Sequence, residues 1–109
     1  MHHTMLPSPL DAFVNSVNGG DTLAFLQFFP LDGVVNDWGR EFVGHAAIRG
    51  WSDKEFIGAK GHLAVTRVSR AGDEVTVDAG WRSNYYSGES RFVFVLEGQK
   101  IRQMHIVEA

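Results

Sequence analysis

Residues 33–51, with the sequence GVVNDWGREFVGHAAIRGW, determine how this chain folds. They predict a short strand that ends in the polar and aromatic pair Asp37 and Trp38, then an extended segment, then a helix that begins at Gly44. A carboxylate beside an indole at the end of a strand is a common way to place a polar group in an apolar pocket. Two amphipathic helices are predicted before these residues and strands after them. We therefore expect them to form the hinge of a small α+β cone.

Length and composition limit the classes of protein to which the chain can belong. Its 109 residues suffice for one domain, which we place at residues 8–109 after a flexible leader over residues 1–7. The net charge is −3 and the ten Lys and Arg residues are scattered, so we expect no nucleic-acid partner. No apolar run approaches the roughly 20 residues that span a bilayer, so we expect no membrane partner and a cytoplasmic location.

The absence of cysteine excludes disulfides, thiolate metal sites and cysteine nucleophiles. The histidines have no HxH or HExxH spacing. We therefore expect neither a metal nor a cofactor.

Capping residues mark the expected helices. Ser8 is the predicted N-cap of the first helix, with Pro9 at the first helical position. Asp21 is the predicted N-cap of a second helix, which Pro30 stops. Residues 52–55, Ser-Asp-Lys-Glu, form another capping box, which predicts that the third helix continues or kinks there.

The second half of the chain predicts strands joined by short turns. We expect strands over residues 63–68, 75–81, 92–96 and 101–107, hairpin turns at 71–73 and 97–100, and a loop over 83–90. Gly80 lies inside a predicted strand, which indicates a bulge or bend.

Residues 92–96 are apolar at five consecutive positions, so both faces of that strand need cover. Three helices cover only one face, and we expect a second copy of the chain to cover the other, which gives a homodimer through the sheet. The alternative is a strongly curved sheet that buries part of both faces within one subunit.

Three loose motifs occur in an order that resembles a known superfamily. They are Gly20-Asp21, then Asp37 with Phe42-Val43-Gly44, Ala47-Ile48-Arg49 and Trp51, then Glu97-Gly98-Gln99-Lys100-Ile101. The chain resembles the nuclear transport factor 2-like (NTF2-like) superfamily, and within it the SnoaL-like and ketosteroid-isomerase-like proteins. The resemblance implies a cone-shaped α+β fold, in which three N-terminal helices pack on a strongly curved, mainly antiparallel sheet around an apolar pocket. Members include isomerases, polyketide cyclases, dehydratases, epoxide hydrolases and pure binding proteins, so the fold leaves the function open.

The resemblance also assigns roles to residues. In ketosteroid isomerases a general-base aspartate occupies the place of Asp37. Their oxyanion-hole tyrosine is Phe13 here, and their late-strand aspartate falls near Arg91 or Phe92. Each missing donor would forfeit about 3–4 kcal/mol, so we do not expect steroid isomerisation by that route. SnoaL-like cyclases use a late-strand acid/base residue, for which His105 is the nearest candidate.

Asp37 and His105 are therefore the candidate catalytic residues, each with an alternative. Asp37 is suited to act as a base in an apolar pocket, or it bonds backbone amides in an Asn-Asp-Trp-Gly turn. His105 has a side chain suited to proton transfer near neutral pH, or it is a solvated or interface residue.

Large aromatic side chains suit a flat or cyclic hydrophobic ligand. The candidate ligand-binding residues are Trp38, Phe13, Trp51, Phe56, Trp81 and Tyr85. The alternative is that Trp51 and Phe56 belong to the core. Asp78 and Arg82 share a face if no bulge intervenes, and with Asp37 they would form the Asp–Arg–Asp network of an epoxide hydrolase; otherwise they form a surface ion pair.

Three functions remain open from the sequence. The first is cofactor-free proton transfer on a small hydrophobic or cyclic molecule, as in an isomerase, cyclase, dehydratase or hydrolase, with Asp37 as the base and His105 as a possible partner. The second is binding of such a molecule without chemistry. The third is a dimeric accessory domain with a filled core.

Overall fold

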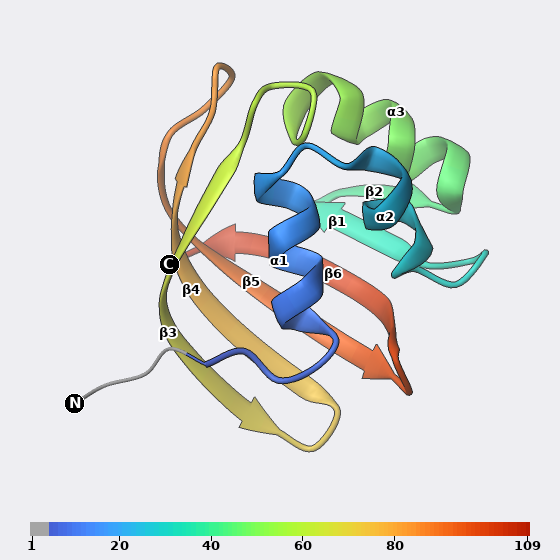
Figure 1. Ribbon diagram of the computed structural model, residues 1–109, viewed down its shortest axis with the longest axis vertical. Helices are drawn as coiled ribbons and strands as arrows, with labels where there is room; N and C mark the ends of the chain where they lie inside the picture. The colour runs from blue at the N-terminus through green and yellow to red at the C-terminus, as the bar shows by residue number, and fades with distance from the viewer. Residues whose placement is uncertain (1–4) are drawn as a thin grey trace.

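The computed structural model describes residues 5–109, so part of the expected leader lies outside the described residues. Three helices precede the four long strands, with two short strands between α2 and α3 (Figure 1). In chain order the elements are α1 (Leu10–Asn18), α2 (Thr22–Gln27), β1 (Val34–Asp37), β2 (Arg40–Val43), α3 (His45–Glu55), β3 (His62–Ala71), β4 (Glu74–Arg82), β5 (Gly88–Glu97) and β6 (Lys100–Glu108).

The six strands form one curled sheet in the order β2-β1-β6-β5-β4-β3. Neighbouring strands are antiparallel except β1 and β6, which run parallel. The helices lie on the inner side of the curl, which confirms the predicted α+β architecture (Figure 1). Within the described residues, no helix is long and apolar enough to cross a membrane.

The helix boundaries confirm one predicted cap and correct two others. The Asp21 side chain accepts a hydrogen bond from the Ala24 amide at 3.1 Å and starts α2 as expected. Ser8 does not cap α1, whose N-cap is Pro9. The Ser8 hydroxyl instead donates to the Gln99 side chain at 2.9 Å, because a contact with the β5–β6 turn replaces the local bond.

The third helix continues through residues 52–55, which is one of the two expected outcomes, but these residues do not form a capping box. α3 runs without interruption from its N-cap Gly44 to Glu55, so Ser52 lies inside the helix. The Ser52 hydroxyl oxygen accepts a hydrogen bond from the Ile57 amide at 3.3 Å, after the helix has ended. The serine therefore stabilises the end of α3.

The pairing register shifts in β3 and again between Val95 and Leu96 near the β5–β6 turn, and not at Gly80, where we expected a bulge or bend. Gly80 pairs regularly with Ala64 on one side and Glu89 on the other. The register shifts between Val65 and Arg67, and the intervening Thr66 donates its hydroxyl to the carbonyl of Asp78 at 3.1 Å. β5 also begins at Gly88, so the loop is shorter than the expected residues 83–90.

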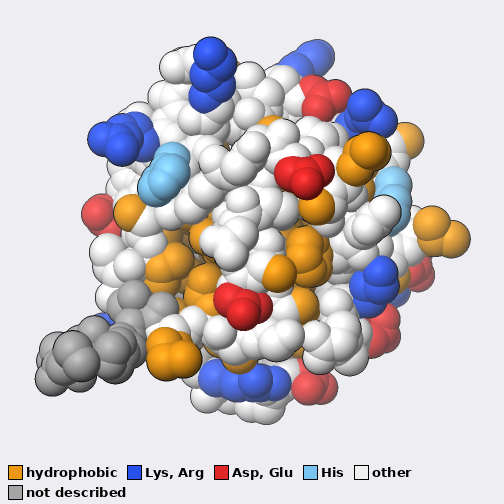
Figure 2. All heavy atoms as spheres, viewed as in Figure 1, with side chains coloured by type: hydrophobic (Ala, Val, Ile, Leu, Met, Phe, Trp, Pro, Cys, Tyr) orange, Lys and Arg blue, Asp and Glu red, His pale blue; other side chains and the backbone are white. Residues whose placement is uncertain are grey.

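The core lies between the helices and the inner face of the sheet. Phe13 is fully buried at its centre, with its ring 5.5–5.9 Å from the rings of Phe25, Phe28, Phe29 and Phe94. Figure 2 shows that Lys and Arg side chains on the viewed face lie apart from one another, with apolar side chains between them near the middle.

The apolar run in β5 divides between the two faces of the sheet. Phe92, Phe94 and Leu96 are buried against the core, whereas Val93 and Val95 are half-buried on the outer face. One face of the strand is thus fully buried and the other is partly covered within a single chain. The homodimer therefore remains a prediction.

Candidate functional site

A pocket of about 340 Å³ opens where the β1–β2 hairpin, α3 and the adjacent ends of β4, β5 and β6 come together. Its volume lies in the range of small-molecule sites. All three tryptophans of the chain contribute to its wall. The lining residues are Asp37, Trp38, Arg40, Trp51, Glu55, Phe56, Trp81, Tyr85, Tyr86, Ser90, Phe92 and Ile106.

The pocket contains two carboxylates bridged by one guanidinium. Arg40 Nη2 donates to Asp37 Oδ2 at 2.7 Å, and Arg40 Nη1 and Nη2 donate to the two carboxylate oxygens of Glu55 at 3.0 and 2.6 Å. The indole Nε1 of Trp51 donates to the same Asp37 oxygen at 3.0 Å. Both acidic side chains are 14% exposed and Arg40 is 50% exposed. Two fixed donors therefore set the orientation of the Asp37 carboxylate.

The local sequence explains why Asp37 faces the pocket. Asp37 and Arg40 are paired residues at the end of the β1–β2 hairpin, so their side chains lie on the same face. The turn between them places Trp38 at φ 54° and Gly39 at φ 91°. Asn36, on the opposite face, makes the turn bond by accepting from the Gly39 amide at 2.9 Å. The alternative expected from the sequence, in which the Asp37 side chain bonds backbone amides of the turn, is therefore not observed; Asn36 makes that bond.

Arg40 controls the electrostatics of the acidic pair. Its hydrogen bonds hold the pKa of Glu55 below its usual range, against the opposing effect of burial, which raises that pKa. The contact with Glu55 in turn raises the pKa of Arg40. The lining contains two acidic residues and one arginine, so the formal net charge of the pocket is −1.

Four aromatic rings stack in a column, and three of them, those of Trp51, Phe56 and Trp81, line the pocket. The ring centroids are 5.9 Å apart for Phe42 and Trp51, 4.8 Å for Trp51 and Phe56, and 4.6 Å for Phe56 and Trp81. At the rim, Trp38, Tyr85 and Tyr86 are exposed large aromatic residues that also line the pocket. Trp51 and Phe56 are thus both buried core residues and pocket residues.

The structure brings together five of the six aromatic residues selected from the sequence. Phe13 is the exception, since it is fully buried among other phenylalanines and does not line the pocket. Tyr86, considered with Tyr85 as a lining residue from the sequence, also lines the pocket. Five lining residues were not selected from the sequence: Arg40, Glu55, Ser90, Phe92 and Ile106. The available signal for Glu55 was its place at the C-terminal end of the helix that carries Trp51, but its capping-box pattern suggested another role.

His105 lies away from Asp37. It pairs with Asn36 on β1 and Val93 on β5, and its neighbours Met104 and Ile106 are buried on the inner face. His105 is therefore on the outer face of the sheet, outside the pocket lining. The geometry does not bring together a pair of acid and base residues made of Asp37 and His105.

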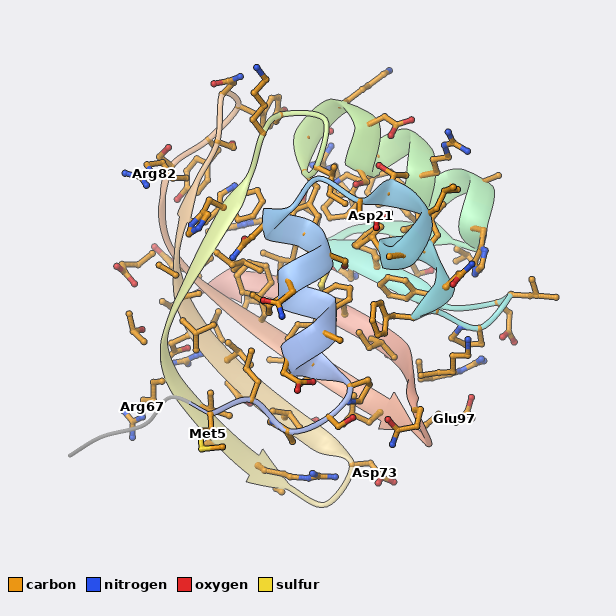
Figure 3. The ribbon with its side chains drawn as sticks, in the orientation of Figure 1. Met5, Asp21, Arg67, Asp73, Arg82 and Glu97 are labelled. Carbon is orange, nitrogen blue, oxygen red and sulfur yellow. The ribbon has the colours of Figure 1, made fainter. Side chains whose placement is uncertain are left out.

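The expected Asp–Arg–Asp network with Asp78 and Arg82 is not formed. Asp78 accepts two hydrogen bonds from Arg91, at 2.7 and 3.3 Å, on the outer face, and Arg91 lowers the pKa of Asp78. Arg82 points away from the helices on the outer side of the sheet (Figure 3). The only such acid–arginine–acid arrangement at the pocket lining uses Asp37, Arg40 and Glu55. Within residues 5–109, no three His, Asp or Glu side chains are grouped as metal ligands.

Solved structures identify the fold. A protein from Sinorhizobium meliloti, named as a candidate polyketide cyclase, superposes with a TM-score of 0.85 at 22% identity, covering 97% of this chain and 100% of that one. A ketosteroid-isomerase-like protein from Catenulispora acidiphila, in complex with trimethylamine, gives 0.78 at 22% identity over 94% and 88% of the chains. The epoxide hydrolase/cyclase-like enzyme SalBIII, of pyran ring formation in salinomycin, gives 0.82 at 20% identity over 92% and 87%.

The chain has the NTF2-like fold. At these identities the comparisons establish the architecture and leave the activity open. No protein-family model and no curated protein sequence matches the chain. The architecture named from the three sequence motifs is thus confirmed, and the function must be argued from the pocket.

Proposed function

We propose that this protein binds a small apolar or cyclic molecule in the aromatic pocket and that Asp37 takes a proton from it without a cofactor. The observation that carries the proposal is the asymmetry of the Asp37 carboxylate. Its Oδ2 is held by Trp51 and Arg40, whereas Oδ1 has no hydrogen-bond partner among the described residues. A base needs an available lone pair in a fixed position, and Asp37 combines the two.

Glu55 is suited to a supporting role. Both of its carboxylate oxygens accept hydrogen bonds from Arg40, which leaves neither as available as Asp37 Oδ1. Its charge holds Arg40 in place, and Arg40 in turn orients Asp37. Glu55 and Arg40 are therefore positioning residues in the proposed site.

The named activities of the structural neighbours support a small-molecule ligand for this pocket. The neighbours include a candidate polyketide cyclase, an epoxide hydrolase/cyclase-like enzyme and a protein in complex with trimethylamine. The molecules that these names imply differ in their chemistry, so they support a small-molecule site and do not select one substrate. The net charge of −1 disfavours an anionic ligand.

The experiment uses 5-nitrobenzisoxazole, a flat probe that reports transfer of one proton. A base removes the ring C–H proton, the electrons of that bond complete a nitrile, and the N–O bond breaks with its electron pair going to oxygen, which gives a coloured cyanonitrophenolate. We expect catalysis above the rate of acetate in solution, and we expect Asp37→Asn to lower kcat/KM by about 100-fold or more. Asp78→Asn is the matched control, because it removes a carboxylate that bonds an arginine on the outer face.

Equal rates for the wild type and Asp37→Asn would refute a proton-transfer role for Asp37. Binding of the probe without turnover, measured by quenching of tryptophan fluorescence, would support the non-catalytic binding function instead. Absence of both binding and turnover would favour the accessory-domain function.

Water activation is a second candidate, favoured by the arrangement of Asp37, Arg40 and Glu55. Two acids bridged by an arginine are the groups that an epoxide-hydrolase-like reaction needs, although they are not the residues expected from the sequence. In that reaction Asp37 takes a proton from water while the oxygen of the water attacks an epoxide carbon. The C–O bond at that carbon breaks, and the resulting alkoxide takes a proton from solvent to give the diol. Hydrolysis of styrene oxide to its diol, lost in Asp37→Asn and retained in Asp78→Asn, would support this function.

We also propose that the protein forms a homodimer through the outer face of the sheet. Val93, Val95 and Val107 are half-buried there, next to the polar His105. Sedimentation equilibrium tests the proposal, with Val93→Lys as the disrupting variant. A monomeric wild type would favour the alternative, in which curvature alone covers this face.

A further inference from the structure

Three polar side chains are buried in the described chain, and they differ in how their hydroxyl groups are used. Ser16 donates to the carbonyl of Phe13 at 2.6 Å, and Ser52 accepts from an amide at 3.3 Å. Ser90, only 2% exposed, has no hydrogen-bond partner among the described residues. A mostly buried hydroxyl without a protein partner needs some accessible surface, at which water or a ligand can bond it.

The Ser90 hydroxyl opens onto the pocket. Ser90 is a lining residue, and no buried side-chain oxygen among the described residues lacks both accessible surface and a partner. The residues beside it on the inner face of β4 and β5 are Ala79 and Phe92, neither of which has a polar side chain. Its partner on β6 is Glu108, which is exposed and does not line the pocket. The other lining residues on β4, β5 and β6 are Trp81, Phe92 and Ile106, so Ser90 carries the hydroxyl group of this part of the wall.

The strand register places Ser90 and Asp37 at opposite ends of the pocket floor. Asp37 pairs with Ile106 on β6, Ile106 pairs with Phe92 on β5, and Ser90 lies two residues before Phe92 on the same face. Two strand spacings and two residues of rise separate the Cα atoms by about 12 Å in a flat sheet, and less in a curled one. The side chains of Ile106 and Phe92, both pocket residues, lie between the two polar points.

We propose that Ser90 is a specificity-determining residue that binds a second polar group of the ligand, at the end remote from Asp37. The ligand class is a neutral ring system with a hydroxyl group at the end that meets Asp37 and a hydroxyl or carbonyl oxygen at the remote end. One polar group would lie at Asp37 Oδ1, the rings would cover Ile106 and Phe92, and the other group would bond Ser90. This inference rests on the proposed binding of a small cyclic molecule in the same pocket.

The inference explains why the wall contains a serine at this position. A site that contains a hydrogen-bonding group discriminates against an analogue that lacks the matching group, because the protein group is then left unpaired. One neutral hydrogen bond changes affinity by roughly three- to tenfold. Ser90 would thus select for the polar remote end, whereas Asp37 would act at the reacting end.

The test compares 2-naphthol, which has one hydroxyl, with 2,6- and 2,7-dihydroxynaphthalene, which have a second hydroxyl at the far end. Dissociation constants are measured by NMR titration of the three indole N–H signals, all of which report on the pocket. We expect at least one diol to bind the wild type about three- to tenfold more tightly than 2-naphthol. In Ser90→Ala this ratio should fall to about one, with 2-naphthol bound as well as before or more tightly.

Ser16→Ala is the matched control, since it removes a buried serine hydroxyl in α1, and it should retain the diol preference. A diol preference that persists in Ser90→Ala would overturn the inference and leave the proposed function intact. Binding of 2-naphthol without any diol preference in the wild type would do the same. Absence of binding of all three probes would overturn both the inference and the proposed pocket ligand.

Discussion

Replacing Arg40 with methionine tests how the acidic pair of the pocket is held. The substitution removes three N–H···O contacts of 2.6–3.0 Å and leaves Asp37 and Glu55, each 14% exposed, without their shared cation. Methionine retains an apolar stem beside Phe42, over whose ring the guanidinium carbon lies at 5.7 Å. The perturbation is therefore mainly the loss of charge and hydrogen bonds.

The expected loss of stability follows from the exposure of the three groups. Hydrogen bonds to charged groups contribute about 1.5–3 kcal/mol, and exposed ion pairs contribute at most about 1 kcal/mol. The carboxylates are mostly buried, but Arg40 is 50% exposed, so solvent screening reduces the effect. We expect Arg40→Met to lower the free energy of unfolding by about 1.5 kcal/mol at neutral pH, which lowers the urea midpoint by roughly 1 M.

The pH dependence of this loss has a defined sign. Arg40 lowers the pKa of Glu55 in the folded protein, so the unfolded chain binds this proton more readily. The stabilisation is therefore fully present above the usual pKa of Glu, near 4.5, and is lost as the pH falls through the lower folded-state value. Arg40→Met lacks this contribution, so the wild type and the variant should differ most near about pH 7 and less at about pH 4.

Urea denaturation monitored by tryptophan fluorescence measures both quantities. Arg102→Met is the matched control, because Arg102 pairs with the exposed Asp32 outside the pocket, and its effect on stability should be smaller. A loss for Arg40→Met no larger than the roughly 0.5 kcal/mol typical of surface substitutions would refute the reasoning. So would a loss that is the same at both pH values.

Two further substitutions test the aromatic wall and the orientation of the base. A Cβ atom at Gly61 would overlap the Trp81 indole, so Gly61→Ala should destabilise the protein by about 1–3 kcal/mol in urea denaturation and shift the Trp81 indole signal. Gly50→Ala, in α3 with open space around the new methyl, should instead stabilise by about 0.5–1 kcal/mol. Trp51→Phe retains a ring but removes the donor to Asp37, and should lower the free energy of unfolding by about 1.5 kcal/mol. An unchanged urea midpoint for Trp51→Phe would mean that the indole bond does not hold the carboxylate.

The parts of the fold that local chemistry determines were predictable from the sequence. Asp21 caps its helix, Gly44 starts α3, and Ala71-Gly72-Asp73 forms a hairpin turn with Gly72 at φ 63°. These features depend on side-chain to backbone bonds or on glycine within a few residues. Ser8 shows the limit of that reasoning, because a tertiary partner 91 positions away replaced the local bond.

The sequence identified most of the large aromatic residues that line the pocket, because such side chains tend to be buried near the end of a sheet. It did not identify which residues bond Asp37. Glu55 is separated from Arg40 by 15 residues and meets it only through the packing of α3 on the hairpin, which no sequence period reveals. For His105 a signal existed: its neighbours Met104 and Ile106 are large and apolar, and strand alternation therefore places the histidine on the opposite face.

The same alternation separates the two interpretations of Asp37 that the sequence left open. In β1, Asn36 points to the outer face and bonds the turn, whereas Asp37 points to the inner face, beside Ile106 and opposite Arg40. Asn36 thus bonds the turn, and the Asp37 carboxylate stays available to act as a base. A carboxylate that bonded the turn amides itself would be less available. A shift of the strand register by one residue would exchange these faces. The pairing of β1 with β6 and β2 is therefore what makes Asp37, and not its neighbour, the candidate catalytic residue of the pocket.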